Sequence, residues 1–177
     1  MNIPAIQCQK VCQSYGKQNV LDNIEIVVPE GNFYGLVGVN GSGKSTLIKA
    51  ILDLVSIDKG LISIFGNPHR KVSAREHVAY LPDRFSPPIH LKCKDFIHYM
   101  LELHSSRQNN VEIHKMLDAL ELDREIMGSS VGRLSKGMTQ KLGLASCLLS
   151  RKTLLILDEP MSGLDPKARV SFKTQLF

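Results

Sequence analysis

The segment 38–46, GVNGSGKST, restricts what this chain can fold into more than any other stretch of its sequence. It follows the apolar run 33–38, FYGLVG, which predicts a short buried strand. It precedes LIKAILDLV, residues 47–55, whose apolar positions recur at the spacing of one helical face. A glycine-rich turn between a strand and a helix directs the free N–H groups of the helix toward one point. The segment therefore predicts an anion-binding nest within an α/β fold.

The residue types in this segment suit a phosphate chain. Gly38, Gly43, Lys44 and Ser45 follow the pattern G-x-x-x-x-G-K-[ST]. Glycines let the backbone approach phosphate oxygens, the lysine adds a positive charge, and the serine supplies a hydroxyl for Mg²⁺. The alternative, a glycine-rich turn that matches by accident, is disfavoured by the strand before it and the helix after it. The nucleotide-binding residues predicted here are Gly38, Asn40, Gly41, Ser42, Gly43, Lys44, Ser45 and Thr46.

A second pattern lies near the C-terminal end. The run 154–159, LLILDE, places Asp158 at the carboxyl end of a predicted buried strand, where open α/β sheets bind their ligands. An aspartate in that place can hold Mg²⁺, and the neighbouring Glu159 can accept a proton from an attacking water. A pair of acids that only faces solvent or caps a turn is the alternative, and the glycine-rich segment argues against it.

The rest of the chain alternates strand and helix patterns. We predict further strands in 24–28, 78–83 and 153–158, a turn, a strand and a turn in 58–68, and helices in 93–104, 111–122 and 136–150. Strands that alternate with helices indicate an α/β fold around a largely parallel sheet. Residues 84–131 have only helical spacing, so this block is predicted to be a helical insert.

Composition sets wide limits on function. The chain has 177 residues, of which 43% are hydrophobic and 22% are charged, as in a globular domain. No run approaches the roughly 20 apolar residues needed to cross a bilayer, and the N-terminus lacks the pattern of a secretory signal. The formal charge of +5 is dispersed and aromatic residues are 6%, so no nucleic-acid partner is expected. The four cysteines are too scattered for a disulfide framework, which favours a reducing cytosol.

Two cysteine-containing pairs could in principle hold a metal. Cys8 with Cys12, and His90 with Cys93, have suitable spacing, but neither has a second pair to complete a site. Both pairs are predicted to be structural.

Three further motifs resemble those of one known family. LSKGMTQK, residues 134–141, resembles the signature sequence of ABC-type ATPases, and SGLDP, residues 162–166, resembles their D-loop. Tyr15 resembles the aromatic residue that stacks on adenine ahead of the P-loop. The order of motifs is the ABC order, and the resemblance covers nearly the whole chain.

The resemblance implies an α/β P-loop NTPase fold of the ABC type. Its sheet core would be mostly parallel, with an N-terminal antiparallel β part and a helical insert. Residues 1–83 and 132–177 would form the ATPase core, without its C-terminal part, and 84–131 the helical subdomain.

The resemblance also implies roles for single residues. Glu159 would be the catalytic base. Ser45 and Asp158 would hold Mg²⁺, and Asp83 would be a weaker ligand of the same ion. ATP would lie between two cassettes, so that Ser135, Lys136 and Gly137 contact the nucleotide of the partner. Asp165 would belong to the D-loop.

The implied function is that of the ATP-hydrolysing motor subunit of a bacterial ABC transporter. Its partners would be a second nucleotide-binding domain, identical or different, and integral membrane subunits that select the substrate. The chain would be cytoplasmic and peripheral at the inner face of the cell membrane. LSKGMTQK together with YLPD is more similar to exporter-type subunits. The alternatives are a non-transport ABC ATPase and an ATP-gated regulatory module without efficient turnover.

The chain departs from the family pattern at several positions. Asp83 stands where a glutamine is usual, and a carboxylate cannot donate a hydrogen bond as an amide can. Lys136 and Met138 replace glycine and glutamine within the signature. No histidine follows Glu159, so none matches the switch histidine of the family. We hypothesise a truncated chain, because the absent strand belongs inside the sheet, where its loss would leave backbone groups unpaired and weaken catalysis by this chain alone.

Overall fold

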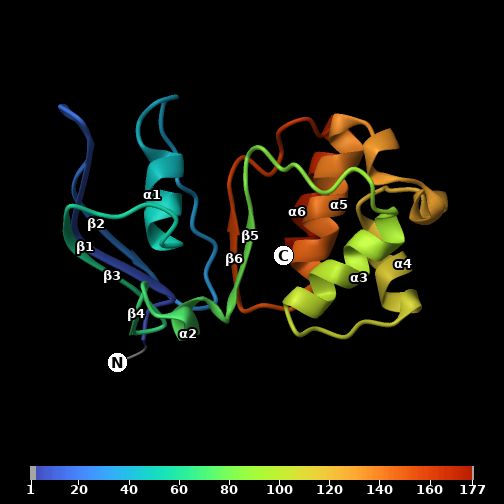
Figure 1. The fold of residues 1–177 in the computed structure, drawn as a ribbon, viewed down its shortest axis with the longest axis horizontal. Helices are drawn as coiled ribbons and strands as arrows, with labels where there is room; N and C mark the ends of the chain where they lie inside the picture. The colour runs from blue at the N-terminus through green and yellow to red at the C-terminus, as the bar shows by residue number, and fades with distance from the viewer. Residues whose placement is uncertain (1–2, 177) are drawn as a thin grey trace. The chain divides into compact units, whose positions relative to one another are not determined.

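The structure is a computed structural model that describes residues 3–176. The chain forms two compact units, Met1–His77 and Val78–Phe177, and each is described by itself. Figure 1 traces the elements of both units along the chain.

The first unit is built on an antiparallel sheet with the strand order β2-β1-β3-β4. Its elements are β1 (Ile6–Tyr15), β2 (Gln18–Val28), α1 (Lys44–Ile51), β3 (Lys59–Ile64), β4 (Asn67–Pro68) and α2 (Val72–Arg75). In β1 the side chains of Ile6, Cys8, Val11 and Gln13 are buried, so the period of two slips by one residue. Lys10 lies in the slip with φ 47°, which marks a β-bulge.

Helix α1 buries the face that its sequence predicts. Leu47, Ile48, Ala50 and Ile51 are buried, and the helix contacts β2 and β3. The helix ends at Ile51, before the predicted end at residue 55, and Asp53 then adopts a left-handed conformation with φ 58°. Its first residue, Lys44, belongs to the glycine-rich segment, so the predicted junction of loop and helix is confirmed.

The predicted strand 33–38 is wrong for this structure. The segment forms no strand, and its apolar residues are exposed, with Phe33 at 59% and Val37 at 93%. An apolar run indicates a tendency to be buried, but a strand exists only where a neighbouring strand supplies a hydrogen-bond ladder. The ladders formed by the described residues join other segments of the chain.

The second unit combines a short parallel sheet with a group of helices. Its elements are β5 (Val78–Leu81), α3 (Cys93–Leu103), α4 (Asn110–Ala119), η1 (Arg124–Gly128), η2 (Val131–Arg133), α5 (Lys136–Leu149), β6 (Leu154–Leu157) and α6 (Pro166–Leu176). Strands β5 and β6 pair in parallel, and the Asp158 N–H extends the pairing by donating to the Leu81 oxygen at 2.9 Å. The predicted helices at 93–104, 111–122 and 136–150 and the strands at 78–83 and 153–158 are confirmed, with small shifts at their ends.

Helix α5 lies at the centre of this unit. Every residue from Gln140 to Cys147 is buried, and α3, α4 and β5 contact the helix (Figure 1). A helix that is buried on all faces packs closely against a neighbouring segment on at least one side, and Gly143 allows this because it has no side chain. A Cβ atom at Gly143 would lie 2.7 Å from Leu81 Cδ1 and 2.8 Å from Phe85 Cε1.

The four cysteines differ in burial, with Cys8, Cys93 and Cys147 buried and Cys12 partly exposed. Cys8, Cys12, Cys93 and Cys147 are all free. Burial raises the pKa of the Cys8 thiol to about 11 and that of the Cys147 thiol to about 12, so both are poor nucleophiles at neutral pH. Among residues 3–176, no helix has both the length and the apolar character needed to span a membrane.

Gly143→Ala is expected to lower the free energy of unfolding by about 1–3 kcal/mol, because the added methyl group overpacks the contact of α5 with Leu81 and Phe85. Gly128→Ala is the matched control, since nothing lies within 4 Å of a Cβ atom there. Urea denaturation of both variants measures the difference, and equal stability of the two would contradict this packing.

Candidate functional site

The loop 38–43 of the first unit has a backbone that favours glycine. Gly41 has φ 82° and Gly43 has φ 88°, in the left-handed region that side chains disfavour. A Cβ atom at Gly38 would lie 2.7 Å from Ser42 Oγ, and one at Gly43 would lie 2.8 Å from the Val20 oxygen. The backbone conformation therefore favours glycine at positions 41 and 43, and the Val20 carbonyl further limits the space at Gly43.

The loop leaves the first turn of α1 free to attract an anion. Gly43 is the N-cap, so no side chain caps the helix, and no acidic residue lies in its first turn. The N–H groups of a first turn have no partner within the helix, and the dipole makes this end positive. Ser45 and Thr46 belong to that turn. The arrangement fits a bound phosphate group.

Lys44 holds its ammonium group at the loop. Its Nζ donates to the Gly38 oxygen at 2.7 Å and to the Val39 oxygen at 3.0 Å. The positive charge is thus kept beside the same backbone that supplies the N–H groups. The backbone conformation and the charge both suit the phosphate chain of a nucleotide.

Tyr15 lies at the end of the hairpin formed by β1 and β2. It pairs with Gln18, and about half of its surface is exposed. The same hairpin carries Val20, whose carbonyl oxygen limits the space at Gly43. The hairpin therefore borders the glycine-rich loop, and an exposed ring on it is available for stacking.

The carboxyl ends of β5 and β6 carry the acidic residues of the second unit. Asp158 follows β6 directly and is buried, at 6% exposure, whereas Glu159 is exposed. Glu159 has φ 50°, and its carbonyl oxygen accepts the Ser162 N–H at 2.9 Å, so a tight turn begins there.

Asp83 lies close to the same edge. Burial raises the pKa of the Tyr80 phenol, and the nearby carboxylates of Asp158 and Asp83 raise it further. Both acids therefore lie within electrostatic reach of one phenol.

The residues predicted to hold Mg²⁺ come from both units. Ser45 belongs to the first unit, and Asp83 and Asp158 belong to the second. Among residues 3–176, no three His, Cys, Asp or Glu side chains form a group that could hold a metal ion by themselves. A hydroxyl and two carboxylates are donor types that suit Mg²⁺, which usually takes further ligands from phosphate and water.

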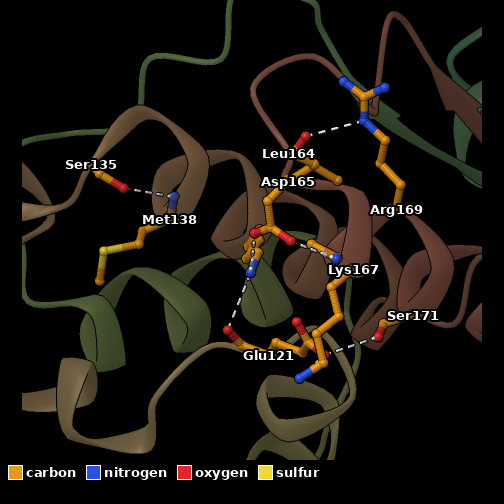
Figure 2. A network of polar contacts seen from close by, with 10 residues as sticks. Glu121, Ser135, Met138, Leu164, Asp165, Lys167, Arg169 and Ser171 are labelled. Carbon is orange, nitrogen blue, oxygen red and sulfur yellow. Dashed lines mark hydrogen bonds and ion pairs between the residues drawn. The ribbon is translucent and has the colours of Figure 1, made fainter.

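The signature segment forms the N-terminus of α5. Ser135 is the N-cap, and its Oγ accepts the Met138 N–H at 3.2 Å (Figure 2). Ser135 and Lys136 are exposed, and Gly137 is half-buried. A Cβ atom at Gly137 would lie 2.8 Å from the Gly163 oxygen, so glycine is required where the helix meets the 162–166 loop.

Asp165 ends that loop and begins α6. Its Oδ1 accepts the Ala168 N–H at 2.8 Å, and its Oδ2 lies 3.7 Å from Lys141 Nζ. The Ala168 amide and, secondarily, the Lys141 ammonium hold the pKa of Asp165 below its usual range. The motif 134–141 contains Lys141, but the sequence alone suggested no role for this residue. Its spacing of four residues from Gly137 places both on one face of the helix, and this spacing could have indicated a shared contact.

A family model matches most of the chain. The model described as ABC transporter matches residues 21–162, which is most of the chain. The matched range includes the glycine-rich loop, the signature segment and the acidic pair.

Curated relatives agree with the family model. The chain is 33% identical over 173 residues to the Nod factor export ATP-binding protein I of Burkholderia orbicola, covering 96% of this chain and 57% of the relative. It is 34% identical over 158 residues to an uncharacterized ABC transporter ATP-binding protein, YhaQ, of Bacillus subtilis, covering 88% of this chain and 52% of the relative. The chain thus spans about half the length of the curated relatives it matches.

A solved structure extends the similarity to the fold. The ATP-binding subunit of an ABC transporter superposes with a TM-score of 0.86 at 29% identity, covering 97% of this chain and 73% of that chain. Together with the match over residues 21–162, this shows that the chain belongs to the ABC transporter ATP-binding family and has its P-loop NTPase fold.

Proposed function

We propose that this chain binds and hydrolyses Mg²⁺·ATP as the motor subunit of an ABC transporter. The observation that carries the proposal is the loop 38–43 with Lys44, where backbone conformation, uncapped helix N-terminus and ammonium converge. In the proposal the loop amides bind the phosphates, Lys44 binds the outer phosphates and Tyr15 stacks on the base.

The acidic edge of the second unit would supply the hydrolytic chemistry. Asp158 is buried and held by the β5–β6 pairing, so it suits a fixed role toward the metal. Glu159 is exposed beside it and suits a proton acceptor for the attacking water. Mg²⁺, when bound, would neutralise charge on the phosphate oxygens.

The N-terminus of α5 would act on the nucleotide of a second cassette. Ser135 presents a hydroxyl and Gly137 an N–H group without a side chain in the way, at the positive end of a long helix. Lys136 would add a positive charge there, and Asp165 would lie nearby in the 162–166 loop of the same cassette. In this proposal ATP joins two cassettes, and hydrolysis separates them.

The direction of transport is inferred from relatives. Several relatives are named Nod factor export ATP-binding proteins, which favours an exporter-type subunit. The cassette would then work with integral membrane subunits and lie at the inner face of the membrane.

One observation favours a second candidate function, ATP-gated association with slow turnover. Asp83 brings a second carboxylate to the edge that holds Asp158, as their joint effect on Tyr80 indicates. Extra negative charge beside the attacking water and the phosphates would slow hydrolysis without preventing binding at the loop.

We expect Mg²⁺·ATP to raise the melting temperature of the chain. At a ligand concentration of 100 Kd the stabilisation would be about 2.7 kcal/mol, or roughly 5–10 °C for a chain of this size. Lys44→Ala should abolish the shift, whereas Lys49→Ala, an exposed lysine on the same helix, should keep it. Scanning fluorimetry with and without nucleotide measures both, and equal shifts in the two variants would contradict nucleotide binding at the loop.

Ser135 allows helix capping and nucleotide contact to be separated. Ser135→Ala should lower stability by about 1 kcal/mol, because the cap on the Met138 N–H is lost. Ser135→Asn should keep stability, since asparagine caps equally well, but the bulkier amide should weaken ATP-dependent dimerisation. Denaturation and analytical ultracentrifugation with ATP provide the two measurements. Dimerisation that is unchanged in Ser135→Asn would speak against the contact in trans.

Asp83→Gln tests the second candidate. We expect a several-fold higher turnover number with little change in ATP affinity, because one negative charge is removed and an amide donor is added. Phosphate release at saturating ATP measures turnover, and Asp95→Gln, an exposed acid on α3, is the control. A lower turnover in Asp83→Gln would mean that the carboxylate assists hydrolysis.

A further inference from the structure

Lys141 is a nearly buried cation placed between three elements of the second unit. Its side chain is 11% exposed, and it projects from α5 toward the end of α4 and the 162–166 loop. Its Nζ donates to the Glu121 carbonyl oxygen at 3.2 Å and lies 3.7 Å from Asp165 Oδ2. Figure 2 shows Glu121 and Asp165, the residues that supply these two oxygen atoms.

Glu121 connects the same elements through its side chain. It follows α4 with φ 54°, and its carboxylate lies 3.0 Å from Lys167 Nζ. It also accepts the Ser171 hydroxyl at 3.4 Å, and both partners belong to α6. The end of α4 is therefore bound to α5 by a carbonyl and to α6 by a carboxylate.

The 162–166 loop contacts α5 at two points on one helical face. Gly137 packs against Gly163, and Lys141 pairs with Asp165. Positions 137 and 141 are one turn apart and lie above one another on the helix. The loop thus contacts the N-terminal half of α5 through Gly163 and Asp165.

Burial makes the ammonium group of Lys141 depend on its two oxygen partners. An ammonium group that is largely buried is costly unless charged or polar partners compensate. Asp165 has a separate task as the N-cap of α6, where it accepts the Ala168 N–H. Its other oxygen is directed to Lys141, so the pair orients the carboxylate and the loop that carries it.

We propose that Lys141 is a positioning residue that fixes the 162–166 loop against the signature segment through Asp165 and the end of α4. The consequence for turnover rests on the proposed function, because there the signature segment and the loop face the nucleotide of the second cassette. Loss of Lys141 would misplace this surface without touching the nucleotide-binding loop of the first unit.

Hydrogen exchange of the chain without nucleotide tests the positioning directly. Lys141→Met keeps the length of the side chain and removes the donor, and Asp165 can then be hydrated because its side chain is 58% exposed. We expect the Ser162 and Leu164 amides to exchange roughly 10-fold faster, while Val78–Leu81 remain unchanged. Lys141→Arg should restore the protection, and Lys94→Met, an exposed lysine on α3, should match the parent.

Asp165→Asn separates the ion pair from the helix cap. Asparagine still accepts the Ala168 N–H, so a gain in loop exchange in this variant assigns the effect to the charge. Loop exchange within twofold of the parent in Lys141→Met would overturn the proposal. So would a gain that extends equally to Val78–Leu81, because that reports global destabilisation.

Steady-state kinetics test the consequence for turnover. Lys141→Met should lower kcat about 10-fold and leave KM for ATP within twofold, and Lys141→Arg should recover most of kcat. A rise in KM with unchanged kcat would overturn this part. A parent chain that does not hydrolyse ATP would count against the proposed function, whereas the exchange experiment would still decide on Lys141.

Discussion

The burial of helix α5 on all of its faces is the constraint on which the second unit depends. The helix is surrounded by the β5 strand and the α3 and α4 helices, and Gly143 allows the closest approach. A helix in this position can expose polar groups only at its ends. At the C-terminal end the Leu149 carbonyl accepts hydrogen bonds from Ser106 and Gln108, both at 3.1 Å. The N-terminal end is capped by Ser135, and Ser135 and Lys136 are exposed, so packing leaves this end of the helix accessible.

The polar contacts around α5 follow from the same burial. Because the helix is enclosed, Lys141 must find its partners within the unit, and it finds them at the end of α4 and in the 162–166 loop. Gly137 adds a backbone contact to the same loop. The loop that follows the acidic pair is therefore positioned by the helix that carries the signature segment. The packing of α5 in the core thus also determines where the 162–166 loop lies in this unit.

The first unit concentrates positive electrostatic potential at the loop 38–43 with few charged groups. The glycines of the loop allow left-handed backbone, the helix N-terminus lacks a cap, and one lysine lies across the loop. Backbone N–H groups and the helix dipole supply most of the attraction for an anion. A chain with a mild and dispersed charge can therefore offer a phosphate group the attractive position that the proposed function requires.

Local chemistry made much of this protein predictable from its sequence. Helices at 93–104 and 111–122 were predictable because their apolar periodicity matches the face that each buries, and Ser135 was recognisable by its residue type as the N-cap of the helix at 136–150. The glycine-rich loop was predictable because its spacing reflects backbone requirements within a few residues. The strand at 33–38 was predicted wrongly, because a strand also depends on a neighbour that a linear pattern does not specify. The sequence by itself determined the motifs, their order and the family; only the tertiary structure decided that Lys141 meets Asp165 and Glu121, since contacts between distant segments depend on how the helices pack.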